Sequence, residues 1–175
     1  MDPTLSDRLQ AVAEALRLAG LPAVFCGPDE DRTAPVVRAI LDGTRPDPEL
    51  VLELTPVPGL DDLSILQLLV GLPVALAPAH LGTLGRSLLE LNSECLLPRF
   101  GMRADARLLY YRAMVPGRPD DLDVEMLVEV VWTVAYLLDR YLPLIRPVAS
   151  GEQDLATAVQ ALGACLRSSD TPPVD

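Results

Sequence analysis

The sequence contains no lysine, since all 14 of its Lys+Arg positions are arginine. Without a lysine amine the chain can form no Schiff base, anchor no pyridoxal phosphate and supply no P-loop lysine. The formal net charge of −11 argues against a protein that coats DNA, because affinity for a duplex rests mainly on cationic contacts with phosphates. Codon usage in a GC-rich genome would explain the arginine bias, and a selected preference for bidentate guanidinium contacts is the alternative.

Histidine and cysteine are scarce as well. His80 is the one histidine, and its nearest nucleophile candidates along the predicted helix are Ser87 and Cys95. A helix would hold His80 and Cys95 ~22 Å apart and Ser87 about two turns away, so neither pair can form a catalytic dyad there. We expect His80 to be a polar residue in the first turn of a helix. Cys26, Cys95 and Cys165 lie among apolar neighbours, which predicts reduced, buried thiols.

Long apolar runs and the common site motifs are also missing. Residues 126–138 contain Glu129 and are fewer than the ~20 residues that cross a bilayer, and residues 1–7 have no apolar core of a secretory signal. No GxGxxG, P-loop or GxSxG motif occurs, and the cysteines lack metal-ligand spacing. The acidic clusters at 29–31, 61–62 and 120–123 sit beside Gly or Pro, where Asp favours turns. We therefore expect a cytoplasmic protein that is not an enzyme and binds no metal or cofactor.

Hydrophobic periodicity predicts one helix followed by strands in the first half of the chain. Thr4 and Asp7 form a predicted capping box for the helix, which Gly20 and Pro22 end. Strict alternation over residues 49–55 indicates a strand with one buried and one less buried face. Residues 63–70 are apolar almost throughout, so a buried helical segment is the alternative interpretation for them. The predicted strands are residues 23–26, 35–41, 49–55 and 63–70.

The second half is predicted to contain a helix over 78–94, a hairpin of strands 99–103 and 107–115, and a third helix that Asp123 caps and Pro143 and Pro147 break. Apolar residues fill most of the third helix's circumference, so it must be covered on nearly all sides. A partner subunit or a bound protein would cover one side, and a helix wrapped by the chain's own elements is the alternative. The candidate surface on this helix consists of Leu127, Val130, Val131, Trp132, Val134 and Leu138.

The hairpin gathers cations and aromatic rings in a chain that is otherwise acidic. Its candidate surface residues are Arg99, Arg103, Arg107, Tyr110, Tyr111 and Arg112. We expect these arginines to pair with carboxylates within the protein or at an interface. A platform for single-stranded nucleic acid is the alternative.

The C-terminal region predicts one more element. Ser150 and Gln153 form a predicted capping box for an amphipathic helix over 150–167, and the polar residues 168–175 predict a flexible tail. No linker divides the chain, so residues 1–149 are expected to form one domain.

Residues 88–151 resemble the YbjN family, whose members have the fold of type III secretion chaperones. The matching features are the helix end at 88–92, strands with 99–101 and 110–112, and the helix segment at 138–143. Its most specific peptides are Leu91-Asn92 and residues 139–143. The sequence departs from the family at the hairpin turn, where Ala106 stands in place of an expected Gly.

This resemblance implies an α+β domain with an antiparallel sheet packed by helices, in the order α-βββ-α-ββ-α, to which the C-terminal helix is an addition. It also implies a homodimer that does no chemistry and binds a flexible or extended segment of another protein. The excess of negative charge suits a basic segment in particular. The alternative is a nucleic-acid accessory protein that uses the Arg/aromatic hairpin, although so acidic a chain disfavours direct binding of nucleic acid and the sequence indicates no membrane partner.

Overall fold

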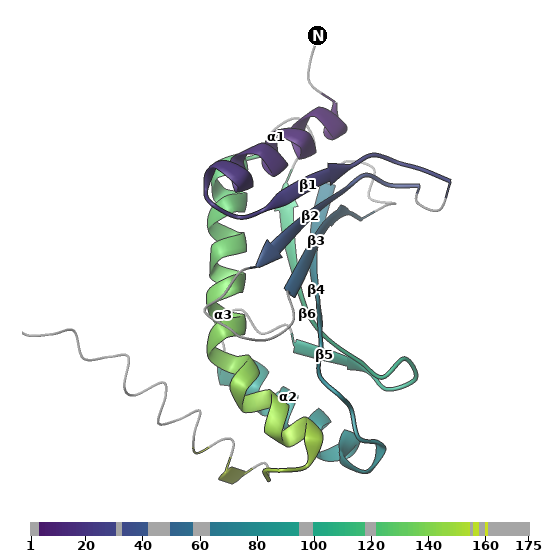
Figure 1. Ribbon diagram of the computed structural model, residues 1–175, viewed down its shortest axis with the longest axis vertical. Coiled ribbons are helices and arrows are strands. Elements are labelled where there is room, and N and C mark those ends of the chain that lie inside the picture. The colour runs from purple at the N-terminus through teal and green to yellow at the C-terminus, as the bar shows by residue number, and fades with distance from the viewer. Residues whose placement is uncertain are drawn as a thin grey trace, which may run out of the picture. The chain divides into compact units, whose positions relative to one another are not determined.

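Six strands and three α-helices make up the described part of the chain in the computed structural model, which covers residues 4–30, 33–41, 50–57, 64–94, 100–117, 122–154, 156–157 and 160. The strands form an antiparallel sheet in the order β1-β2-β3-β4-β6-β5 (Figure 1), so the predicted α+β class is confirmed. The elements are α1 (Leu5–Leu18), β1 (Ala23–Cys26), β2 (Val36–Leu41), β3 (Leu50–Pro56), β4 (Ser64–Leu72), the 3₁₀ helix η1 (Pro78–His80), α2 (Leu81–Glu94), β5 (Phe100–Arg103), β6 (Leu108–Gly117) and α3 (Val124–Ser150).

The chain forms two compact units, each built from two separate segments. Unit 1 contains residues 1–73 and 110–136, and unit 2 contains residues 74–109 and 137–175. The chain passes from one unit to the other after Pro73, within β6 and within α3.

The first helix of unit 1 begins at the predicted capping box. Thr4 Oγ1 accepts a hydrogen bond from the Asp7 backbone N–H at 3.2 Å, and Asp7 Oδ2 accepts one from the Thr4 N–H at 2.8 Å. The Thr4 hydroxyl also donates to Asp7 Oδ2, which lowers the pKa of that carboxyl. α1 lies against β1 and β2 (Figure 1), and its buried residues are Leu9, Val12, Ala13 and Leu16.

The four strands predicted from periodicity are all present in unit 1. β4 is a strand and not a helical segment, because it pairs antiparallel with β3 from Leu52 opposite Val70 to Pro56 opposite Leu66. The order α-βββ-α-ββ-α is therefore wrong by one strand. The first half has four strands because β1 pairs along its whole length with β2, from Ala23 opposite Ala39 to Cys26 opposite Val36.

α3 begins where the sequence predicts and ends later. Asp123 Oδ1 accepts a hydrogen bond from the Met126 N–H at 2.9 Å, which confirms the predicted cap. The predicted breaks at Pro143 and Pro147 are wrong, because both prolines lie inside the helix, which continues to Ser150. A proline inside a helix frees the carbonyl four residues earlier. Pro143 is exposed, and the next turns bury Ile145, Val148 and Ala149, so that packing in unit 2 offsets the lost hydrogen bond.

The cap predicted at Ser150 is wrong as well. Ser150 is the last residue of α3, and Gly151 follows it with a φ of 80°, the left-handed conformation that ends many helices. Instead Asp154 Oδ1 accepts from the Thr157 N–H at 2.8 Å, and this hydrogen bond lowers the pKa of Asp154. The rest of the predicted C-terminal helix and the tail at 168–175 lie outside the described residues.

The hairpin turn of unit 2 places its left-handed residue at Arg107. The Arg107 N–H donates to the Ala104 carbonyl at 3.3 Å, and Arg107 has a φ of 47°. A left-handed conformation strains a residue that carries a Cβ and suits glycine. No glycine is therefore needed at position 106, because the residue with the left-handed conformation is Arg107.

We predict that Arg107→Gly stabilises the protein by about 0.5–1 kcal/mol, because relief of the left-handed strain exceeds the extra entropy of glycine in the unfolded chain. Urea unfolding monitored by circular dichroism measures the change. Ala106→Gly is the matched control and should destabilise slightly, since Ala106 has no positive φ to relieve. Equal effects of the two variants would contradict the turn geometry.

Candidate functional site

The structure buries much of the surface predicted on α3 and the hairpin. These buried side chains, each 0% exposed, are part of the chain's own core and do not lie on a partner surface as predicted. These side chains are buried because they lie on the inner side of their helix or strand. One stripe of α3 and alternate residues of β6 point into the core. The buried candidates are Tyr111, Leu127, Val131, Val134 and Leu138.

The opposite side of α3 in unit 1 carries exposed aromatic and acidic side chains. Trp132 is 41% exposed and Tyr136, one turn further on, is 58% exposed. Glu125 and Glu129 are exposed one turn apart on the same side, since residues four apart lie above one another on a helix. We call Glu125, Glu129, Trp132 and Tyr136 the α3 aromatic face. Trp132 is among the predicted surface residues and Tyr136 is not, although its spacing of four residues from Trp132 could have indicated it.

Two of the predicted hairpin arginines lie at its tip in unit 2. Arg103 Nη2 donates to Asp105 Oδ2 at 2.7 Å, and this contact lowers the pKa of Asp105. Arg103 and Arg107 are both exposed. The pairing agrees with the expectation of Arg–carboxylate contacts within the protein. Arg99 lies outside the described residues.

The remaining hairpin candidates lie on β6 in unit 1. The Arg112 guanidinium carbon is 5.9 Å from the centroid of the Tyr110 ring, a cation–π contact between alternate residues of one face. Tyr110 is half-buried and Arg112 exposed, whereas Tyr111 between them is buried on the other face. The aromatic rings of the hairpin are thus divided between two faces. Val130, the last predicted surface residue of α3, is half-buried.

The strands of unit 1 have one buried face and one open face. The alternation predicted for β3 is confirmed, because Leu50, Leu52 and Leu54 are buried while Val51 is 40% exposed. The same alternation continues into the neighbouring strands through the antiparallel register, which sets residues of one row opposite one another. The central row of the open face is Val24, Arg38, Glu53 and Leu69, which lie opposite one another on β1, β2, β3 and β4.

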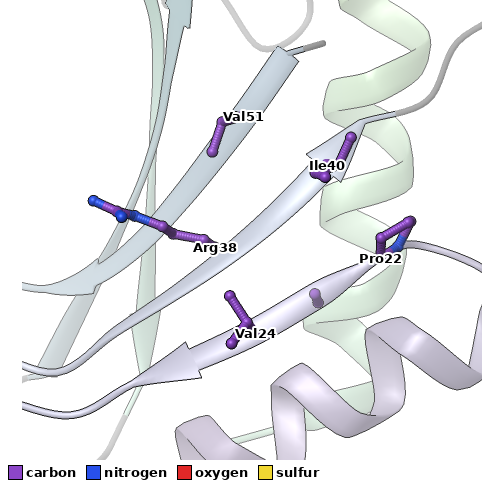
Figure 2. A pocket seen from close by; sticks show the side chains of 6 residues that line it. Pro22, Val24, Arg38, Ile40 and Val51 are labelled. Atoms are coloured by element: carbon purple, nitrogen blue, oxygen red, sulfur yellow. The ribbon is translucent and has the colours of Figure 1, made fainter.

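An ion pair and a hollow mark this open face. Arg38 contacts Glu53 Oε1 through Nε at 2.9 Å and Nη2 at 2.8 Å across the two strands. Beside the pair is a hollow of about 360 Å³, with Val24, Ile40 and Val51 on three adjacent strands (Figure 2). Pro22 lines its rim, and Val24 is 51% exposed. The open face therefore combines aliphatic side chains with one balanced pair of charges.

The free edge of β1 is short and partly occupied by a side chain. β1 has four residues, and Ala23 carries its carbonyl toward the outside of the sheet, because the neighbouring Pro22 carbonyl bonds inward to the Ile40 N–H at 2.8 Å. Arg17 Nη1 from the last turn of α1 donates to the Ala23 carbonyl at 3.3 Å. A short edge with an occupied carbonyl is a poor template for an added strand.

In unit 2 a comparable side chain holds β5. Asn92 of α2 donates through Nδ2 to the Phe100 carbonyl at 2.9 Å and accepts from the Phe100 N–H through Oδ1 at 3.0 Å. The Phe100 ring packs edge-on against Tyr141, with centroids 6.2 Å apart and an interplanar angle of 78°. Asn92 and Tyr141 belong to the two peptides that carry the family resemblance. These peptides therefore meet at Phe100, and their role there is packing.

His80 packs against the end of α3 in unit 2. It is half-buried in η1, immediately before α2, as predicted for a polar residue at the start of a helix. A Cβ placed on Gly151 would collide with its imidazole ring. Cys26 is a free, half-buried thiol, and Cys95 and Cys165 lie outside the described residues. Among the described residues no three His, Cys, Asp or Glu side chains gather to hold a metal ion, and no described helix is long and apolar enough to span a bilayer.

Comparison with protein-family models finds no match, and neither does comparison with curated proteins or with solved structures. The resemblance to the YbjN family therefore stays a prediction, and the function must be argued from the surfaces described above.

We predict that Asn92→Ala destabilises the protein by about 2 kcal/mol, because it removes two hydrogen bonds from partly buried backbone groups of Phe100. Asn92→Asp keeps an acceptor for the Phe100 N–H but sets a second carboxylate oxygen against the Phe100 carbonyl, so it should cost at least as much. Urea unfolding is the measurement. Ser93→Ala, which removes an exposed hydrogen bond to Glu90, is the control and should stay within about 0.5 kcal/mol of the wild type.

We predict that Gly151→Ala destabilises the protein by about 2 kcal/mol or more, because the new methyl group meets His80 and the φ of 80° disfavours alanine. His80→Ala in the same chain should recover the steric part and leave a cost of about 1 kcal/mol. Thermal unfolding of the wild type, the two single variants and the double variant measures this coupling. Strictly additive effects would show that the ring and residue 151 do not meet.

Proposed function

We propose that the protein is a cytoplasmic, non-enzymatic, chaperone-like adaptor that acts as a homodimer and binds a flexible, basic segment of another protein. The observation that carries this proposal is the α3 aromatic face. Trp132 and Tyr136 are large apolar rings exposed beside the carboxylates of Glu125 and Glu129. Exposed aromatic rings with a defined charge next to them are typical of binding surfaces.

The chemistry of this face suits arginine or lysine side chains. A guanidinium or ammonium group placed over Trp or Tyr gains a cation–π contact, and a carboxylate one turn away can accept its hydrogen bonds. From Glu125 to Tyr136 the face is ~16 Å long, which an extended segment of about five residues would match. The net charge of −11 attracts such a segment from a distance.

The α+β architecture supports the same proposal at a coarser level. A sheet with one helix-covered face is compatible with the secretion-chaperone fold that the YbjN resemblance implies, and the peptides behind the resemblance pack at Phe100. Proteins of that fold hold extended segments of other proteins. The particular fold and the chaperone role remain part of the proposal.

The alternative, a nucleic-acid accessory protein, has less support from the hairpin. Bases stack on exposed aromatic rings. Phe100 and Tyr111 are buried, Tyr110 is already covered by Arg112, and Arg103 is paired with Asp105. The open face of unit 1 combines aliphatic side chains with the paired charges of Arg38 and Glu53, which favours a protein partner.

The test is an affinity pull-down from the native lysate, with quantitative mass spectrometry, of the wild type, Trp132→Ala and Glu129→Arg. We expect proteins with a basic, flexible segment to be retained by the wild type and to fall at least about tenfold in both variants, as for residues central to an interface. Leu89→Ala is the matched control, because Leu89 is an exposed apolar residue of α2 in unit 2.

Equal retention by all four proteins would sink the proposed site. A synthetic peptide with the basic sequence of a retained protein should bind the wild type with an affinity that falls as salt rises. If a single-stranded oligonucleotide binds in low salt instead, and Arg112→Ala abolishes binding while Trp132→Ala does not, the nucleic-acid function is the correct one.

A further inference from the structure

The central row of the open face is self-complementary. It runs from the aliphatic Val24 through the cation Arg38 and the anion Glu53 to the aliphatic Leu69, one residue from each of four neighbouring strands. Reversing the row exchanges the two aliphatic positions and the two opposite charges. A second copy of the same row, turned around, therefore matches the first at every position.

One symmetry operation produces this match. A two-fold axis that runs parallel to the strands, above the gap between β2 and β3, turns a second copy of the sheet face down onto the first. It places Arg38 of each copy over Glu53 of the other, and Val24 of each over Leu69 of the other. Sheets packed face to face lie ~10 Å apart, a gap that Arg and Glu side chains together can bridge. The contact is isologous, as two-fold dimers require.

The row beside it obeys the same rule. Ile40 lies opposite Val51 on the strands next to the axis, so the operation stacks Ile40 of each copy on Val51 of the other. These residues line the hollow in Figure 2, and both are β-branched, the residue type that packs well on a covered sheet face. Burial of the hollow between two copies would remove its aliphatic lining from water.

Pairing through the free edge of β1 is disfavoured by contrast. The edge strand has four residues, and Arg17 already bonds the outward carbonyl of Ala23. This leaves the face of the sheet as the larger uncovered surface of these strands.

We infer that the open face of unit 1 is the homodimer interface, packed face to face on a second copy with reciprocal Arg38–Glu53 contacts. The inference rests on the homodimer of the proposed function and adds which surface forms it. The α3 aromatic face then remains available to bind the basic segment of the partner protein, which we call the client. The dimer interface and the client site therefore lie on different surfaces of unit 1.

The experiment uses charge reversal in separate copies. In Arg38→Glu alone, two Glu–Glu contacts would face each other across the interface, and in Glu53→Arg alone, two Arg–Arg contacts. Each variant should raise the dimer dissociation constant about a hundredfold, measured by sedimentation and light scattering. When the two variants are mixed, both contacts across the interface become Glu–Arg. A heterodimer, identified by native mass spectrometry, should then form within about tenfold of the wild-type affinity.

Two controls separate this effect from folding. Circular dichroism shows whether each single variant keeps its fold, and the double variant Arg38→Glu/Glu53→Arg restores opposite charges both within and between copies, so it should dimerise. Glu14→Arg makes the same change of charge as Glu53→Arg, but on the exposed surface of α1, and should leave the dimer intact. Recovery of the dimer in the mixture cannot come from the ion pair between positions 38 and 53 of one chain, because each variant chain has two like charges at those positions.

Each remaining outcome has a definite meaning. A wild type that is monomeric at micromolar concentration overturns the homodimer of the proposed function and this inference with it. A dimeric wild type whose single reversals are also dimeric overturns the sheet-face interface alone. Dissociation of both single variants without rescue in the mixture overturns the reciprocal contact. Client capture through Trp132 is measured separately and decides none of these.

Discussion

The alternation of side chains along the strands of unit 1 is the constraint on which its other features depend. Because successive residues of a strand point to opposite faces, the leucines at 50, 52 and 54 bind one face of the sheet to the core and leave Val51 and Glu53 on the other. The antiparallel register extends that division to Arg38 on β2 and Leu69 on β4. A slip of one residue between any two strands would move their leucines to the open face and break the row of matched charges.

The same sheet would offer its edges for unwanted pairing if they were left free. Both edge strands are four residues long, and in each unit a side chain from a neighbouring helix occupies backbone groups of the edge. Arg17 fills one carbonyl of β1, whereas Asn92 satisfies both the N–H and the C=O of Phe100 on β5. Short, occupied edges reduce the addition of a strand from another chain.

Periodicity and capping residues predicted all the described strands and the starts of the first and third helices, because these features depend on neighbours in sequence. The end of α3 was not predictable in this way: Pro143 breaks an isolated helix, and only packing of the following turns keeps it helical. Composition likewise showed that α3 is apolar nearly all round but not which side the core covers, so Leu127 and Trp132 received the same role although one is buried and the other exposed. The pairing of Arg38 with Glu53 needs the register of two strands 15 residues apart in sequence, which no local pattern contains.

The open face and the α3 aromatic face of unit 1 differ in their charge. Each copy carries a net charge of −11, so two copies repel one another, and an interface between them cannot afford further unpaired carboxylates. The central row satisfies this condition, since its one cation and one anion cancel. The carboxylates of Glu125 and Glu129 lie on α3 instead, beside Trp132 and Tyr136. In the proposed dimer, two such acidic, aromatic faces would belong to one assembly, and neither would be neutralised. A client with two basic segments would gain from both at once, because the second contact becomes intramolecular. The proposed dimer and the proposed binding of a basic partner are thus compatible. The dimer would rest on the balanced charges of Arg38 and Glu53, and the partner would be attracted by the excess of carboxylates elsewhere.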